Sequence, residues 1–188
     1  QSGGTHTVTN DLSIGQLATG NGTYNMSGGS LNVGGNLDNA AGTSTLNIDG
    51  GTVNVTGSIV NGSGASTLNI DGGTVNAGTI GVDTLNIADS VGTTGSHAMG
   101  SGESISAGSE TIGNSGTGAF TQTGGTNTVA NELFIGRNTG SNGTYSLSGT
   151  GTVSATNEFV GRIGTGSFAQ TGGTNTASNS IELGTLSG

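Results

Sequence analysis

The sequence predicts an all-β chain folded as a β-solenoid, and three observations lead to this prediction. Gly makes up 41 of the 188 residues, while Pro and Cys are absent. Thr, Val and Ile recur in runs that alternate apolar with small polar residues, which is typical of strands. Pairs of Gly return about every 22 to 25 residues, a period that fits one coil with three short strands and three corners.

The repeat is explicit in two parts of the chain. Residues 46–55, LNIDGGTVNV, return as LNIDGGTVNA at residues 68–77. Residues 120–128, FTQTGGTNT, return as FAQTGGTNT at residues 168–176. At this period the chain forms about eight coils, in which each strand pairs with its counterparts about 4.8 Å above and below.

Alternation before each Gly pair predicts the core, because successive side chains of a strand point to opposite faces. Apolar residues that recur at equivalent positions should therefore stack inside the solenoid. The predicted core residues are Tyr24, Met26, Leu46, Ile48, Leu68, Ile70, Leu85, Ile87, Phe120, Tyr145, Leu147 and Phe168. The outward Asn rows 25/47/69/86 and 32/54/76 are expected to form ladders of hydrogen-bonded amides.

Some coils carry Gln at the second core position, and a polar residue then follows five positions later. The pairs are Gln122 with Asn127, Gln170 with Asn175, and Gln1 with His6. Because buried polar groups need partners, we expect the two side chains of each pair to contact each other across the Gly corner. The alternative is that two sub-families of coil were inherited as units, with no such contact.

The repeat lapses at residues 89–109, which are predicted to be an irregular loop or insertion within one solenoid spanning residues 1–188. Residues 95–101, GSHAMGS, look like the remnant of a cleaved expression tag. The segment is therefore either a natural loop or a junction between two joined pieces.

Residues 118–149 carry the unit GAFTQTGGTNTVANELFIG, followed by GTYSLSG. This unit resembles the autotransporter-associated β-strand repeats of bacterial surface proteins, and the resemblance extends over most of the chain. It implies an exported, right-handed parallel β-helix that acts as a passenger, a stalk or a surface-layer element.

The charge pattern argues against several functions. Two Arg, no Lys and eleven carboxylates give a net charge of -9, which disfavours a nucleic-acid surface. No apolar run is long enough to span a membrane. Asp49 and Asp71 occupy the same corner of consecutive coils and form a weak Ca²⁺ candidate. The alternative is that each accepts hydrogen bonds from the Gly amides that follow it.

No group of residues predicts catalysis, and no cofactor is expected. Arg137 and Arg162 occupy equivalent corners, and we expect solvated ion pairs between them and Glu132 and Glu158, worth about 0–1 kcal/mol each. The residues His6 and His97 are alone in their coils, so a His-based metal site is not expected either.

These observations predict a non-enzymatic structural protein located outside the cell or on a bacterial surface. Its subunits would stack end to end into a filament or surface layer, since neither end of the solenoid shows a cap. Residues 185–188 would begin a strand that the next subunit lacks. The alternatives are a fragment of a longer passenger, and an adhesin that binds a glycan or matrix.

Overall fold

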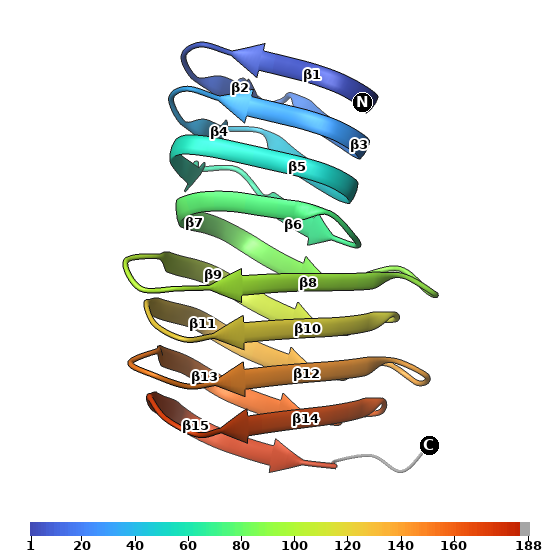
Figure 1. The fold of residues 1–188 in the computed structure, drawn as a ribbon, viewed down its shortest axis with the longest axis vertical. Helices are drawn as coiled ribbons and strands as arrows, with labels where there is room; N and C mark the ends of the chain where they lie inside the picture. The colour runs from blue at the N-terminus through green and yellow to red at the C-terminus, as the bar shows by residue number, and fades with distance from the viewer. Residues whose placement is uncertain (185–188) are drawn as a thin grey trace.

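The computed structural model of the protein describes residues 1–184. These residues form a parallel β-solenoid of about eight turns, with the strands stacked along one long axis (Figure 1). Every strand pairing in this part of the chain is parallel. The described residues contain no helix, and hence none long and apolar enough to cross a membrane.

The strands form two sheets. Strands β8, β10, β12 and β14 form a four-stranded sheet, and the other strands form an eleven-stranded sheet. Long strands such as β5 bend round the corners, so that the three short strands predicted for each coil are often continuous. The bounds are β1 Ser2–Val8, β2 Leu12–Ile14, β3 Asn21–Val33, β4 Leu37–Asn39, β5 Thr43–Asn61, β6 Ser66–Ile70, β7 Thr74–Ile87, β8 Thr94–Met99, β9 Ser104–Ile112, β10 Thr117–Gln122, β11 Thr126–Ile135, β12 Asn142–Leu147, β13 Thr152–Val160, β14 Thr165–Gln170 and β15 Thr174–Leu183.

One corner of the coil requires a left-handed backbone, and Gly supplies it in most coils. Gly136 has a φ of 74°, and a Cβ there would lie 2.0 Å from the carbonyl oxygen of Thr165 in the next coil. The equivalent position after Ile87 is held by Ala88, which has a φ of 59° and is fully buried. Ala88 is the one residue other than Gly with a positive φ among the described residues.

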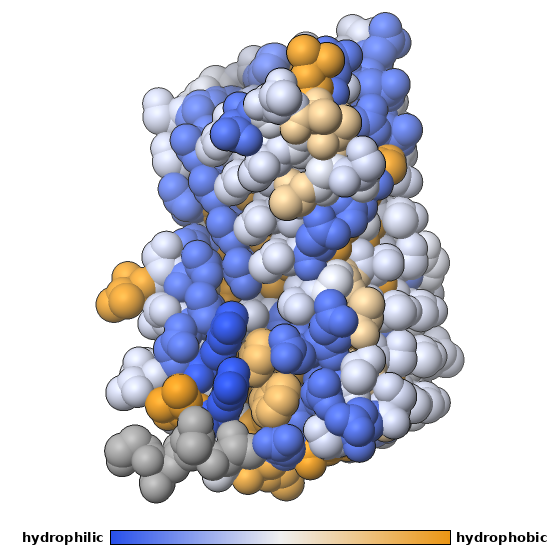
Figure 2. Space-filling model, turned by 180° about the vertical axis from the view of Figure 1, so that it is seen from behind, coloured by the Kyte–Doolittle hydropathy of each residue, from blue (hydrophilic) through white to orange (hydrophobic). Residues whose placement is uncertain are grey.

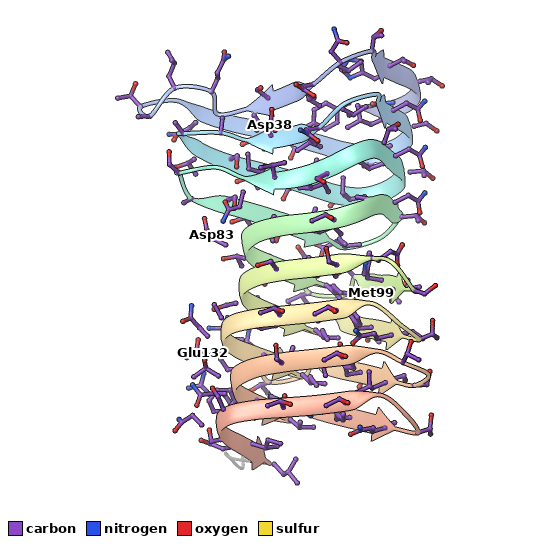
Figure 3. All side chains as sticks on the ribbon, turned by 90° about the vertical axis from the view of Figure 1, so that its left-hand side faces the viewer. Asp38, Asp83, Met99 and Glu132 are labelled. Atoms are coloured by element: carbon purple, nitrogen blue, oxygen red, sulfur yellow. The ribbon has the colours of Figure 1, made fainter. Side chains whose placement is uncertain are left out.

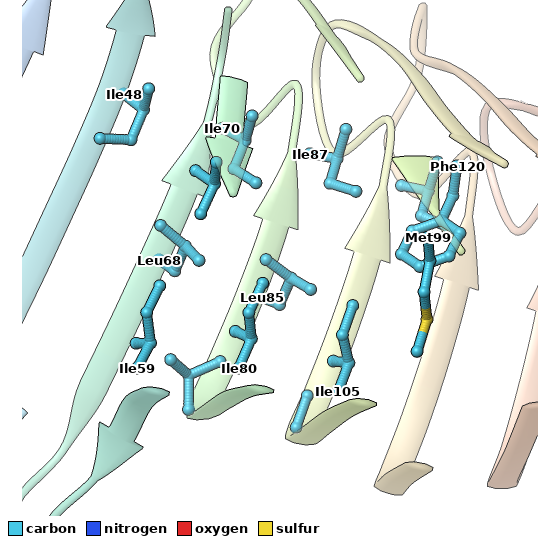
Figure 4. Packing of buried hydrophobic residues seen from close by; sticks show 14 of the residues in the cluster. Ile48, Ile59, Leu68, Ile70, Ile80, Leu85, Ile87, Met99, Ile105 and Phe120 are labelled. Atoms are coloured by element: carbon cyan, nitrogen blue, oxygen red, sulfur yellow. The ribbon is translucent and has the colours of Figure 1, made fainter. Parts of the chain in front are cut away.

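The predicted core residues lie inside the solenoid, where rows of apolar side chains run from coil to coil (Figure 4). Ten of the twelve are buried. Tyr24 and Phe168 are only partly buried. Tyr24 packs against the exposed first coil, and Phe168 lies in the last described coil. The predicted stacking of Leu46 on Leu68 and of Ile48 on Ile70 is confirmed by the register of β5 and β6.

The predicted column through Leu85 and Phe120 is wrong. Leu85 pairs with Leu68 on one side, as expected, but with Glu110 on the other. The cause is one short turn: Asn69 and its partner Asn86 are 17 residues apart, whereas Asn47 and Asn69 are 22 apart. This turn of the solenoid is shorter by about one strand segment. Each segment of the sequence repeat after it therefore lies on the next face of the solenoid from the one that it occupies before the turn.

Residues 89–109 are not an irregular loop. They contain β8 and most of β9, which together form a regular coil. His97 of the tag-like segment pairs in register with Phe120, and Met99 pairs with Gln122. Met99 is buried. His97 is half-buried, and burial lowers the pKa of its side chain, although Glu103 has a smaller opposing effect. The sequence repeat lapses here because the short turn displaces its columns.

Both Asn ladders are confirmed. Asn47, Asn69 and Asn86 each donate a side-chain hydrogen bond of 2.7–2.9 Å to the Asn one coil earlier, beginning at Asn25. The second ladder joins Asn32, Asn54 and Asn76 through bonds of 2.8 Å. The first ladder ends at Asn86, whose column continues as Thr111, Phe134, Phe159 and Glu182.

Candidate functional site

A buried polar network joins three consecutive coils in the second half of the solenoid. The Tyr145 hydroxyl donates to Gln122 Oε1 at 2.5 Å. Asn127 Nδ2 donates to Glu110 Oε2 at 2.8 Å and to the Tyr145 hydroxyl oxygen at 3.3 Å. Gln122 Nε2 in turn donates to the carbonyl oxygens of Gly125 and Thr152. All four of the side chains that form the network are buried.

The expected amide pairing of Gln122 with Asn127 is therefore wrong in its detail. The two side chains are joined through the Tyr145 hydroxyl, which comes from the next coil. The same arrangement occurs in the first coil, where the Tyr24 hydroxyl donates to Gln1 Oε1 at 2.7 Å and lies 3.0 Å from His6 Nδ1. A sequence signal existed, because both Tyr residues of the chain follow a Gln by 23 positions.

The third pair lies in the last described coil and differs from the other two. Gln170 is exposed and donates to the Gly173 carbonyl oxygen, so its predicted burial is wrong in this structure. Asn175 is half-buried, and its Nδ2 donates to Glu158 Oε2 at 2.9 Å. Asn175 Oδ1 is shielded from solvent but has no hydrogen-bond partner among the described residues.

Burial controls the ionisation of this network. Desolvation raises the pKa of Glu110 to about 7, and the hydrogen bond from Asn127 only partly opposes that shift. The pKa of Glu158 is also raised by desolvation, with Asn175 opposing it. Burial is likewise the largest cause of the raised pKa of Tyr145. The Oε1 atoms of both Glu side chains are buried without a partner among the described residues, which favours the neutral acids.

The candidate Ca²⁺ pair divides into two different environments. Asp49 is exposed, whereas Asp71 is largely buried and its Oδ1 accepts hydrogen bonds from the backbone amides of Asp89 and Ser90. Asp71 thus acts as a turn acceptor, although its donors belong to the next coil and not to the Gly residues that follow it. Residues 1–184 contain no group of three or more His, Cys, Asp or Glu side chains that could hold a metal ion.

The two Arg side chains lie over aromatic rings, of which Phe134 is buried and Phe159 is half-buried. Phe134 and Phe159 are each flanked in their strands by residues that point inward, so their own side chains point outward. Their rings stack on each other with 4.9 Å between the centroids and 15° between the planes. The guanidinium carbon of Arg137 lies 4.6 Å from the Phe134 centroid, and that of Arg162 lies 5.3 and 5.4 Å from the two centroids. The lower half of the face in Figure 2 shows hydrophobic side chains beside strongly hydrophilic ones.

This Phe–Arg cluster was not expected from the sequence, which suggested solvated pairs with Glu132 and Glu158. Glu158 is buried against Asn175 and cannot form a solvated pair. Glu132 projects from the same edge of the solenoid as Asp83 (Figure 3). Glu132 precedes the last segment of β11 and Arg137 follows the left-handed Gly136 at its end, so the Cα atoms of the two residues are at most about 16 Å apart.

No protein-family model, no curated protein and no solved structure matches this chain. The β-solenoid fold is established by the strand pairing, and the resemblance to autotransporter-associated repeats stays a prediction.

Proposed function

We propose that this chain is an exported, non-enzymatic structural protein whose solenoids stack end to end into a filament or surface layer. The resemblance to autotransporter-associated repeats supports an extracellular or bacterial-surface location. The observation that carries the proposal is the match between the two outer strands of the stack. β1 pairs only with β3, and β15 pairs only with β13, so each has an open backbone edge within the described structure.

The two open edges have the same sequence pattern. β1 contains Thr5-His6-Thr7-Val8, and β15 contains Thr174-Asn175-Thr176-Ala177. Stacked in register, they would place outward Thr on outward Thr and His6 on Asn175. A ring N–H of His6 could then satisfy Asn175 Oδ1, which has no partner among residues 1–184. Such a contact joins different surfaces of two copies, so it does not close and produces a filament.

Backbone geometry identifies variants that block each edge. The Thr174 amide donates to the carbonyl oxygen of Gly151, the residue before β13, so alternation turns the Ala177 amide to the open edge. At the other end the Val8 carbonyl accepts from Gly34 in the next coil, so Thr7 faces the open edge. Ala177→Pro and Thr7→Pro each remove one outward donor while keeping the bonds within the solenoid.

Sedimentation velocity and negative-stain microscopy at micromolar concentration test the proposal. The unmodified chain should form filaments. Each Pro variant alone should remain monomeric, because every copy lacks one of the two edges that a contact requires. Mixing the two variants should give pairs at most, because each retains only one functional edge. A monomeric unmodified chain, or filaments in either variant, would contradict end-to-end stacking of copies and favour a fragment of a longer passenger. The predicted strand at residues 185–188 lies outside the described residues.

A further inference from the structure

One face of the second half of the solenoid carries a regular array of hydroxyl groups. The first halves of β11, β13 and β15 pair in unbroken register, so their outward side chains form two columns. This hydroxyl array consists of Thr126, Thr152 and Thr174 in one column and Thr128, Ser154 and Thr176 in the other. The same columns continue on β9 as Ser104 and Ser106. Figure 3 shows these strands from the front, with short side chains arranged in two columns.

The array is held rigidly, because the residues between its two columns point inward and are anchored in the core. Asn127 is fully buried and donates hydrogen bonds to Glu110 and to the Tyr145 hydroxyl. Asn175, the equivalent residue of β15, donates to Glu158. Thr is branched at Cβ, so its χ1 is restricted and its hydroxyl keeps a fixed direction. The buried polar network therefore fixes the positions of the hydroxyls above it.

The hydroxyls of the array are available to water. They make no hydrogen bond to another residue of the described part of the chain, and all six side chains are exposed or half-buried. The outward Asn rows differ, because their amides bond to one another from coil to coil. The array also carries no charge, although the chain has a net charge of -9. Asp83 and Glu132 lie at the edge of this face (Figure 3).

The spacing of the array matches a lattice of water. Equivalent residues of successive strands are about 4.8 Å apart, and alternate residues of one strand are about 6.6 Å apart. These distances are similar to the repeats of hexagonal ice along its a and c axes. Water molecules bound to the hydroxyls therefore take positions that resemble those in the crystal. Carboxylates would orient the water around themselves instead, so the absence of charge in the array favours this match.

We propose that the hydroxyl array binds the surface of ice crystals through the water molecules that it orders. A copy adsorbed on ice confines growth to the gaps between adsorbed copies. The growing surface then curves, which lowers the temperature at which it advances. This binding goes beyond the structural role proposed above and does not depend on the assembly of copies.

Thermal hysteresis of the full-length chain, measured on single ice crystals in a nanolitre osmometer, tests the proposal. The unmodified protein at micromolar concentration should freeze ice below the temperature at which the same crystal melts. Thr128→Tyr with Thr176→Tyr should abolish this difference, because the rings stand above the plane of the array. Thr128→Ser with Thr176→Ser should retain more of it, since the hydroxyls remain.

A matched control separates the array from the rest of the surface. Thr117→Tyr with Thr165→Tyr places the same two rings at exposed positions of β10 and β14, which belong to the four-stranded sheet. These positions are two coils apart, as are Thr128 and Thr176. The control should keep its hysteresis. No hysteresis from the folded unmodified chain, equal loss in the control, or full hysteresis in the Thr128→Tyr, Thr176→Tyr variant would each overturn the proposal. Far-UV circular dichroism establishes that every variant is folded.

Discussion

The buried carboxyl group of Glu110 should make this solenoid more stable in mild acid than at neutral pH. Its pKa rises from an ordinary value of 4.5 to about 7 because burial disfavours the charged form. Since one pKa unit corresponds to about 1.36 kcal/mol, the difference amounts to about 3 kcal/mol. The folded state binds the proton more tightly than the unfolded state. The free energy of unfolding is therefore highest below about pH 4.5 and falls as the pH rises to about 7.

Glu110→Gln isolates this contribution, because the amide has the shape of the neutral acid and cannot ionise. Thermal unfolding followed by circular dichroism at pH 4 and pH 7.5 is the assay. At pH 4 the variant and the unmodified protein should have similar midpoints. At pH 7.5 the variant should be more stable by about 3 kcal/mol, which corresponds to a midpoint roughly 6–12 °C higher for a chain of this size.

Glu182→Gln is the matched control, since Glu182 is an exposed carboxylate on β15, the last strand of the same sheet. It removes the same charge but should raise the midpoint at pH 7.5 by much less. An equal gain in both variants would show that general charge repulsion causes the pH dependence. If Glu110→Gln brought no gain at pH 7.5, the reasoning about the buried carboxyl would be refuted.

Three further substitutions test other parts of the fold by thermal or denaturant unfolding. Ala88→Gly should stabilise the protein by about 1 kcal/mol, because it relieves a left-handed backbone at a non-Gly residue; a lower midpoint would contradict this explanation. Tyr145→Phe should cost about 1–3 kcal/mol by leaving buried amides without their shared partner, and Tyr24→Phe should cost less in the exposed first coil. Leu68→Asp should unfold the neighbouring coils because it buries an unpaired charge, and an unchanged midpoint would argue against the observed core column.

Where the coil length is constant, the sequence was sufficient to predict the register. The Asn ladders and the stacking of Leu46 on Leu68 follow from the 22-residue spacing alone. Prediction failed after Leu85, where the column was expected to continue to Phe120, since a constant period cannot reveal a turn that is one strand segment shorter. The outward direction of Phe134 was not predicted at all, because three consecutive apolar residues conceal the alternation that turns the middle one outward. The hydroxyl of Tyr145 was missed because its partners lie in other coils.

The short turn between Asn69 and Asn86 determines which outward-pointing columns of side chains lie in line along the solenoid. It brings the Asn column into line with Phe134 and Phe159, although the Asn and Phe residues occupy different positions in the sequence repeat. Inserting about five residues near residues 78–83 would rotate the coils that follow by one face of the solenoid about its long axis, leaving the pairing among those coils intact. The length of this one turn therefore sets the rotation between the coils before it and the coils after it. Such a change in length can realign the two halves of a solenoid without any change in their cores.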